Sequence, residues 1–227
     1  MLTLPYQENN IQTAKLHLGE RRSRILSIAE PSYIMIHNQH SLDRHLCTDF
    51  IEKIYREKYQ ADIKVDYPFL MCLHDAKHRI LAAVGFRYAK NSPLFLEHYT
   101  KKPINEILQA PRAQIVEIGS LASAGKGASA FLFTALASYL SHQQIKFAAI
   151  TGTDYLHKYF KRAGLKPQKI CDANIADIAD DSQNWGTYYQ TNPRVLVGSV
   201  DNGVTYLRRI LGAKFEECLD MPQPSFH

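Results

Sequence analysis

The chain has 227 residues, of which 45% are hydrophobic, and a formal net charge of +5. This length and composition predict one large globular domain, or one domain with short appendages, and exclude a disordered or fibrous protein. No stretch approaches the roughly 18–20 apolar residues of a membrane span, and residues 1–10 lack the pattern of a secretory signal, so we expect a cytoplasmic protein without a transmembrane segment.

The first half of the chain predicts a helix followed by a hairpin. Residues 1–40 are expected to be irregular, apart from a short strand at Tyr33–Ile36. Ser41 is placed to cap a helix that runs to about Tyr59, because its apolar residues recur at helical spacing. Two apolar runs on either side of a polar turn then predict an antiparallel hairpin, 69–73 and 79–88.

The second half alternates between strands and helices. Pro103 is well placed to open a short helix that ends at Gln109. The elements predicted after it are strand 115–121, helix 128–144, strand 146–151, helix 155–162, strand 195–200 and helix 204–211. This order indicates an α+β (mixed α/β) domain on one sheet. We assign it to residues 41–212, with a polar tail at 213–227.

Cysteine spacing and charge narrow the possible partners. The chain contains Cys47, Cys72, Cys171 and Cys218, which are far apart and have no zinc-site spacing, so we expect reduced, mostly buried thiols and no metal. The clearest basic cluster, residues 21–24, is short and belongs to no recognisable nucleic-acid module. We therefore expect no nucleic-acid partner, whereas the mild positive charge is compatible with phosphates or an acidic carrier protein.

Residues 114–128 are the most informative part of the chain. A buried strand with one carboxylate, Glu117, leads through Gly125-Lys126-Gly127 into the long apolar helix. The first amides of a helix have no intrahelical partner and favour phosphate, and a carboxylate just upstream can accept a proton. This arrangement is typical of a coenzyme-A-dependent acyltransferase. The structural alternative is that Glu117 ends an edge strand beside an arginine and the glycines form only a tight turn.

Several segments, taken together, resemble the thermostable hemolysin family of bacterial proteins. They span about residues 45–200 and are Ala82–Ala89, Leu94–Tyr99, Ile115–Ala122, Phe160–Pro167 and Trp185–Tyr189. A wider resemblance is to the GNAT acyltransferases and, within them, the acyl-homoserine-lactone synthases, whose landmarks are matched by Arg87, Leu94–Tyr99 and Glu117. The resemblance implies a GNAT-like twisted mixed sheet flanked by helices. Its strands would separate between 115–121 and 146–151, and the pantetheine arm of a thioester would lie in that gap.

The resemblance also implies roles for individual residues. Glu117 would be the catalytic base for an amine that attacks a coenzyme A or phosphopantetheine thioester. The donor would be held by Leu121, Ser123, Gly125, Lys126, Gly127 and Ala128. Arg87 would either orient Glu117 or bind an acceptor carboxylate. Glu97 would line the acceptor side or belong to a solvated loop, and Trp185 would shape an acyl tunnel or pack in the core.

The chain also departs from these families at three positions. Ala122 stands where GNAT enzymes usually have Arg or Gln, and Phe160 stands where many have a tyrosine general acid; we expect the neighbouring Tyr159 to point elsewhere. Ser120 stands where the homoserine-lactone synthases have an arginine. These departures favour a longer acyl group on a carrier protein over acetyl-coenzyme A, and an acceptor other than that of the lactone synthases.

Three functions remain open at this level. The first is an N-acyltransferase that uses an acyl-CoA or acyl-carrier-protein donor and a small amine or amino-acid acceptor. The second is a membrane-active hemolysin, for which the sequence offers neither a pore hairpin nor an apolar span. The third is a non-catalytic module that binds an acyl carrier, since fold alone does not decide function.

Overall fold

The computed structural model describes residues 1–19, 30–125, 127–162, 164–178 and 183–218. In these ranges the strands are β1 (Leu2–Glu8), β2 (Ile11–Leu18), β3 (Pro31–His37), β4 (Phe69–Asp75), β5 (Ile80–Tyr88), β6 (Ile115–Ser123), β7 (Phe147–Gly152), β8 (Gln168–Asp172), β9 (Arg194–Ser199) and β10 (Lys214–Glu217). The α-helices are α2 (Arg44–Tyr59), α3 (Ile104–Leu108), α4 (Ala128–His142), α5 (Asp154–Arg162) and α6 (Val200–Leu211). The basic cluster at 21–24 lies outside the described residues.

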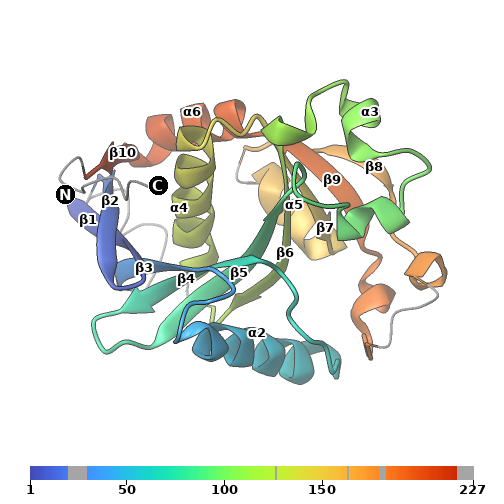
Figure 1. Ribbon diagram of the computed structural model, residues 1–227, viewed down its shortest axis with the longest axis horizontal. Coiled ribbons are helices and arrows are strands. Elements are labelled where there is room, and N and C mark those ends of the chain that lie inside the picture. Colours follow the sequence, from blue (N-terminus) through green and yellow to red (C-terminus); the bar gives the residue numbers. More distant parts are fainter. Residues whose placement is uncertain (20–29, 126, 163, 179–182, 219–227) are drawn as a thin grey trace, which may run out of the picture.

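These strands form one mixed sheet in the order β10-β2-β1-β3-β4-β5-β6-β7-β9-β8 (Figure 1). The pairs β1–β3 and β6–β7 are parallel, whereas β4, β5 and β6 are joined by antiparallel ladders. The prediction of a mixed sheet flanked by helices is confirmed. The hairpin and the elements predicted from residue 115 onward are present with bounds within four residues, and strand β8, which the sequence analysis did not predict, lies among them.

Helices cover both faces of the sheet (Figure 1). Helix α2 packs against β4, β5 and β6 on one face, and α4 packs against β3, β4 and β5 on the other, where it also contacts α6. Side chains alternate along a strand, so Val116 and Ile118 of β6 join the core under α4. Ile115 lies on the opposite face, in a core formed with the segment 94–104. Glu117 therefore points to the α2 face.

The two ends of the chain differ from the sequence expectation. Residues 1–40 were expected to be largely irregular, yet β1, β2 and β3 lie inside the sheet, and β10, in the expected tail, pairs antiparallel with β2. Every second residue is buried along both strands, as in Leu4 and Tyr6 of β1 and Ala14 and Leu16 of β2, and these side chains anchor the two strands in the core. Pro5 and the polar turn after β1 obscured that alternation in the sequence.

Two helix starts also differ. Ser41 does not cap α2, because its hydroxyl bonds Asn9 and the amide of Asn38 in the preceding turn. Helix α6 begins at Val200, four residues before the predicted start, because the Ser199 hydroxyl accepts a hydrogen bond from the amide of Asn202 at 3.2 Å.

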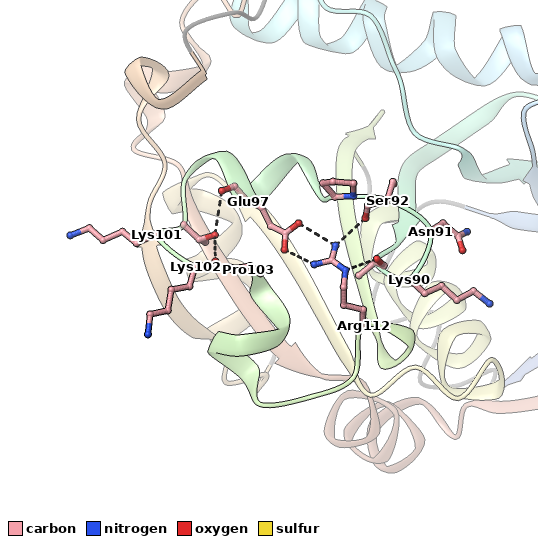
Figure 2. A pocket seen from close by; sticks show the side chains of 11 residues that line it. Lys90, Asn91, Ser92, Glu97, Lys101, Lys102, Pro103 and Arg112 are labelled. Carbon is pink, nitrogen blue, oxygen red and sulfur yellow. Dashed lines mark hydrogen bonds and ion pairs between the residues drawn. The ribbon is translucent and has the colours of Figure 1, made fainter.

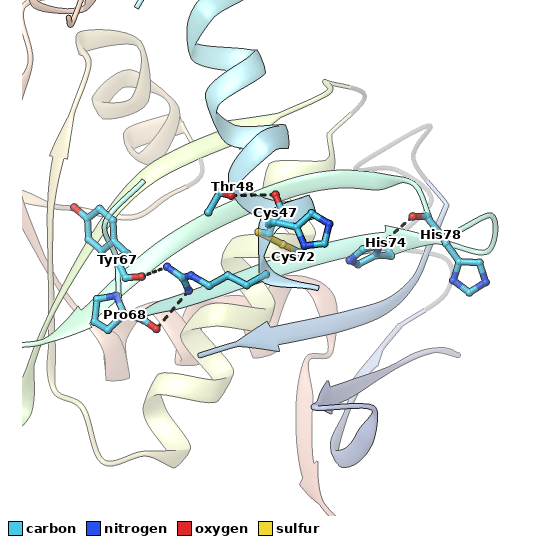
Figure 3. The surroundings of a disulfide bond; sticks show 9 residues. Cys47, Thr48, Tyr67, Pro68, Cys72, His74 and His78 are labelled. Carbon is cyan, nitrogen blue, oxygen red and sulfur yellow. Dashed lines mark hydrogen bonds between the residues drawn. A yellow bond between two sulfur atoms is a disulfide. The ribbon is translucent and has the colours of Figure 1, made fainter. Parts of the chain in front are cut away.

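A disulfide joins Cys47 of α2 to Cys72 of β4 (Figure 3). The expectation of four reduced cysteines was therefore wrong for this pair, whereas Cys171 and Cys218 are free. The two bonded residues are 25 positions apart, so only the packing of the helix onto the strand brings them together. Both are fully buried, and their bond ties α2 to the sheet.

Shortening Leu16 tests whether the N-terminal strands are part of the core. Leu16 is completely buried, so Leu16→Ala is expected to lower the free energy of unfolding by about 2–5 kcal/mol. The matched control is Ile11→Ala in the same strand, where 47% of the residue is exposed, and it should cost less than about 1 kcal/mol. Urea denaturation measures both values. Equal small costs would show that β2 does not contribute to the core.

Thiol labelling tests the disulfide. Iodoacetamide added to the denatured, unreduced protein should modify only Cys171 and Cys218. After reduction, intact mass should show four modified residues. Four modified residues without reduction would contradict the bond.

Candidate active site

The candidate site is a pocket where β6 and β7 separate. Their parallel ladder runs from the pair Ile115–Phe147 to the pair Ile118–Ile150, and no further pair joins them within the described residues. Beyond this point the gap opens into a cavity of about 380 Å³. Its walls come from α2, the second half of β6, the glycine turn, the start of α4, the end of β7, α5 and Tyr188. The expected separation of these two strands is present.

A β-bulge shapes the β6 wall of this pocket. The pairing with β5 shifts between Ala83–Ala122 and Gly85–Gly119, so that Ser120 and Leu121 together face one residue of β5. Ser120 has a φ of 48°, in the left-handed region. On its β7 side, β6 has no pair beyond Ile118 within the described residues, and Gly119, Ser120 and Leu121 line the pocket there.

Glu117 lies just before the bulge and is sealed inside the protein. Only 1% of the residue is exposed. Its Oε1 accepts the Leu96 amide at 2.8 Å and its Oε2 accepts the Phe95 amide at 2.9 Å. Burial raises the pKa of Glu117 to about 7, although these two amides and the Arg87 guanidinium favour the charged form. Glu117 is therefore a carboxyl group poised to exchange a proton near neutral pH.

Arg87 is placed beside Glu117 by the β5–β6 ladder, in which the two residues form a cross-strand pair. Its guanidinium lies 5.4 Å from the centre of the Tyr67 ring and donates to the carbonyl of Asp66 at 2.5 Å. It also lies 3.5 Å from the Asp66 carboxylate, which is largely exposed. Arg87 thus links the carboxyl site to the segment between α2 and β4.

The predicted donor residues are only partly arranged as expected. Leu121, Ser123, Gly125 and Gly127 line the pocket. The expected free amides are fewer, because the Gly125 amide donates to the Ser123 hydroxyl at 3.2 Å and the Ala128 amide donates to the Gly125 carbonyl at 3.2 Å. These internal bonds close the tight turn, in which Gly125 and Gly127 both have positive φ. Ala128 is buried at the start of α4, and Lys126 lies outside the described residues.

Glu97 belongs to a different part of the surface. It lines a separate open basin of about 540 Å³, together with Lys90, Lys101 and Lys102 (Figure 2). Its carboxylate is held by Arg112 at 2.7 and 3.1 Å, and it accepts the amides of Leu94 and Ile104. In the structure Glu97 therefore folds the loop whose amides hold Glu117, and it does not reach the pocket between β6 and β7.

Trp185 lies in an aromatic cluster on the α2 side of the sheet. Its ring is 6.0 Å from Phe95, 5.5 Å from Tyr188 and 5.8 Å from Tyr189, measured between centroids. Tyr188 lines the pocket and donates to the carbonyl of Thr151 at 3.2 Å. Trp185 thus supports the pocket wall from behind.

A second cavity was not anticipated from the sequence. It measures about 600 Å³ and lies between α4, α6, the end of α5 and the strands β7 and β9, with mostly apolar walls. Phe133, Ile150 and Tyr159 line both cavities. The expectation that Tyr159 points away from the site was wrong, because α5 turns this side chain toward the junction of the two cavities. Phe160 is buried in the core and lines only the second cavity.

Tyr67 is a further residue that the sequence did not single out. Its ring lies on Gly85 and Gly119, which form a cross-strand pair. The signal in the sequence was the presence of a glycine in each of two apolar strands, which often marks close approach by another group. Among the described residues, no group of three or more His, Cys, Asp or Glu side chains is placed to hold a metal ion.

Solved structures with this fold show the same overall arrangement of elements. The AHL synthase LasI aligns with a TM-score of 0.55 and 15% identity, over 83% of this chain and 98% of that chain. The CoA-dependent acyl-homoserine lactone synthase MesI aligns with a TM-score of 0.53 and 14% identity, over 83% and 100%. A third, BjaI, solved with SAM and isopentyl-CoA, gives a TM-score of 0.56 and 10% identity, over 78% and 88%. At these identities the likeness establishes the fold.

Sequence comparison establishes the family. A search of curated protein sequences finds no match. The family model described as thermostable hemolysin matches residues 37–204, which is well over half of the chain. This range contains β4 to β9, α2, and both cavities apart from the last turns of α6. The chain therefore belongs to the thermostable hemolysin family.

Proposed function

We propose that this protein is an N-acyltransferase that moves an acyl group from a coenzyme A or acyl-carrier-protein thioester to an amine. The observation that carries the proposal is the pocket between the separated strands β6 and β7, with Glu117 buried beside it at a pKa of about 7. The likeness in fold to acyl-homoserine-lactone synthases supports it. A non-catalytic carrier-binding module would have no need of a buried, half-ionised carboxyl group next to the gap.

The donor thioester would enter the gap along β6. Leu121, Ser123, Gly125 and Gly127 line its wall and would contact the pantetheine arm. Lys126 would add a positive charge for phosphate, and Ala128 would pack under the turn. The reacting carbonyl would lie at the bulge, where Gly119, Ser120 and Leu121 line the pocket and their backbone amides would stabilise the developing oxyanion.

The acyl group would occupy the second cavity. At about 600 Å³ this cavity has the size of a small-molecule site, and Phe133, Ile150 and Tyr159 connect it to the donor pocket. Apolar walls between α4 and α6 suit an aliphatic chain better than an acetyl group. This supports a medium or long acyl donor, in line with the expectation from Ala122 and Phe160.

In the proposed reaction the amine nitrogen attacks the thioester carbonyl. The N–C bond forms, the C–S bond breaks, and the amine proton is taken up by Glu117. The thiolate leaves and is protonated. Since the pKa of Glu117 is about 7, a large fraction of this carboxyl group is ionised at neutral pH and yet basic enough to accept the proton.

The acceptor would be a small amine or an amino acid, and it would approach from the α2 side. Arg87 could bind the carboxylate of an amino-acid acceptor. The solved structure of BjaI holds SAM with isopentyl-CoA. In our proposal the acceptor here is different, because Ser120 stands where those enzymes have an arginine. Glu97 would act on the acceptor only through the loop that it folds, and Trp185 only through the wall that it supports.

The family description favours a second candidate, a membrane-active hemolysin. Among the described residues, no helix has the length and apolar character needed to cross a membrane. Haemolysis would also follow if the enzyme made a surfactant-like N-acyl product. Lysis of red cells by purified protein without any donor would support direct action on membranes.

We retain a cytoplasmic location as part of the proposal, because its donors are cytoplasmic thioesters. The Cys47–Cys72 bond bears on this point, since stable disulfides are typical of oxidising compartments. A bond that persists in protein recovered from cells under thiol-blocking conditions would move the location outside the cytoplasm.

Thiol release with a panel of donors tests the function. Purified protein should release thiol from medium- or long-chain acyl-CoA or acyl-carrier-protein in the presence of an amine pool, and Glu117→Gln should lower the rate by roughly 10²–10⁴-fold. Donor binding, followed by thermal shift, should be retained in Glu117→Gln. Absence of thiol release from every donor would contradict the proposal, and a loss below tenfold would remove Glu117 as the base.

The pH dependence of turnover gives an independent check. Glu117 must be ionised to accept a proton, so kcat should rise about tenfold per pH unit below about 7 and level off above it. The slow residual reaction of Glu117→Gln should lack this step. A wild-type profile that stays flat between pH 5 and 8 would show that no group with a pKa near 7 controls the reaction.

A further inference from the structure

The Glu117 carboxylate has no direct contact with the pocket in which the substrate would bind. Both carboxylate oxygens are occupied by backbone amides, and the residue is 99% buried. Glu117 is not among the residues that line the pocket, although Gly119, two positions along the strand, is. A base enclosed in this way needs another group to carry a proton from the substrate.

Tyr67 packs on the β5–β6 ladder at Gly119, two residues along β6 from Glu117. A Cβ added to Gly85 would lie 2.5 Å from Cγ of Tyr67, and one added to Gly119 would lie 2.0 Å from its hydroxyl oxygen. Since Gly85 and Gly119 are cross-strand partners, the ring lies flat across the β5–β6 ladder in a slot that only glycines leave open. Its hydroxyl therefore lies at Gly119, next to the bulge. Gly119 lines the pocket, whereas the Tyr67 side chain stands just behind this wall.

The ring and backbone of Tyr67 are held firmly. Arg44 of α2 donates to the backbone carbonyls of Tyr67 and Pro68, two residues that are labelled in Figure 3. The Arg87 guanidinium lies over the ring, 5.4 Å from its centre. A residue fixed in this manner presents its hydroxyl at a defined point on β6.

The hydroxyl itself has no partner among the residues that the structure describes, although other tyrosines of this region do. Tyr188 donates to the carbonyl of Thr151, and the hydroxyls of Tyr99 and Tyr189 bond each other. This hydroxyl is not among the sealed, unpartnered polar atoms of the described residues, so it is open to solvent beside Gly119 and available to a ligand. Burial, followed by the negative charge of Glu117, raises the pKa of Tyr67 well above 10, so this phenol is protonated at neutral pH.

We propose that Tyr67 is a catalytic residue that contacts the substrate at the bulge and passes protons between the substrate and Glu117. This inference rests on the proposed acyl transfer. As the amine nitrogen forms its bond to the carbonyl carbon, the amine proton moves to the Tyr67 oxygen and the phenol proton moves to Glu117, directly or through one water. When the C–S bond breaks, the proton returns by the same path to the thiolate.

This role explains how the chain can lack a tyrosine at residue 160. Phe160 and Tyr159 lie on the α4 side of the sheet, whereas Tyr67 approaches the same strand from the α2 side, where Glu117 lies. A phenol supplied from the segment before β4 takes the place of one supplied from α5. Tyr159, at the junction of the two cavities, is the other phenol that could transfer this proton, so its variant is compared with that of Tyr67.

The test compares single-atom deletions in the full-length protein with the donor and amine that give thiol release. Tyr67→Phe keeps the ring in its glycine slot and removes only an unpartnered hydroxyl, so the melting temperature should stay within about 2 °C. We expect kcat to fall at least about 100-fold, with donor binding unchanged. Tyr33→Phe serves as the control. Tyr33 lies on β3, far from the site, and its hydroxyl bonds His78 at 2.8 Å, so kcat should be unchanged.

A double variant distinguishes a shared proton path from two separate effects. If Tyr67 and Glu117 act in series, Tyr67→Phe combined with Glu117→Gln should be no slower than the slower single variant. Multiplied losses would overturn the relay, and so would a Tyr67→Phe enzyme within threefold of wild type or a large loss confined to Tyr159→Phe. If the wild type releases no thiol from any donor, the proposed function fails, and the role of Tyr67 fails with it.

Discussion

The structure depends on one interruption of backbone pairing, the end of the β6–β7 ladder after Ile118 and Ile150. Parallel strands in the middle of a sheet normally satisfy each other along their length. Here the two strands diverge, so a cavity opens between them, walled by both strands and by residues of α2, α4 and α5. The antiparallel ladder with β5 resumes at Ala122 and holds β6 in place beyond the bulge. This support on one edge allows Ser120 to keep a positive φ that would otherwise be unfavourable.

The second constraint is the burial of Glu117. An ionised carboxyl group inside a protein is unfavourable unless fixed donors compensate for lost water. The amides of Phe95 and Leu96 supply that compensation, and they are held in position by Glu97 and Arg112. The result is a balance in which the carboxyl group is neither locked in the charged state nor fully neutral near pH 7. The Glu97–Arg112 ion pair thus holds the loop whose two amides bind the Glu117 carboxylate.

In the proposed function, the two faces of the sheet would have different roles. On the α4 side the walls are apolar and the second cavity can hold an aliphatic chain. On the α2 side lie the polar groups, with Tyr67, Arg87 and Glu117 close to the same stretch of β5 and β6. The gap between β6 and β7 connects these sides. An acyl donor that passes through it would present its carbonyl to the polar face while its chain stays in the apolar one.

The sequence by itself determined the parts of the molecule that depend on neighbouring residues. The hairpin, the helices α2, α4 and α5, the glycine turn and the position of Glu117 on a buried strand all follow from local periodicity and turn residues. The segments that resemble the thermostable hemolysin family fall within residues 45–200, close to the range of the family match. The mixed sheet and the separation of its strands followed from that resemblance.

Only the tertiary structure decided the rest, because it depends on contacts between residues far apart in the chain. The N-terminal strands form because β2 gains partners on both sides, from β1 and from β10 nearly 200 residues later. The cysteine pair and the glycine slot for Tyr67 likewise require α2, β4, β5 and β6 to be packed together. The sequence left Glu97 on the acceptor side or in a solvated loop, whereas in the structure Arg112 holds its carboxylate. Sequence spacing records none of these distances, since each is set by how the sheet is assembled.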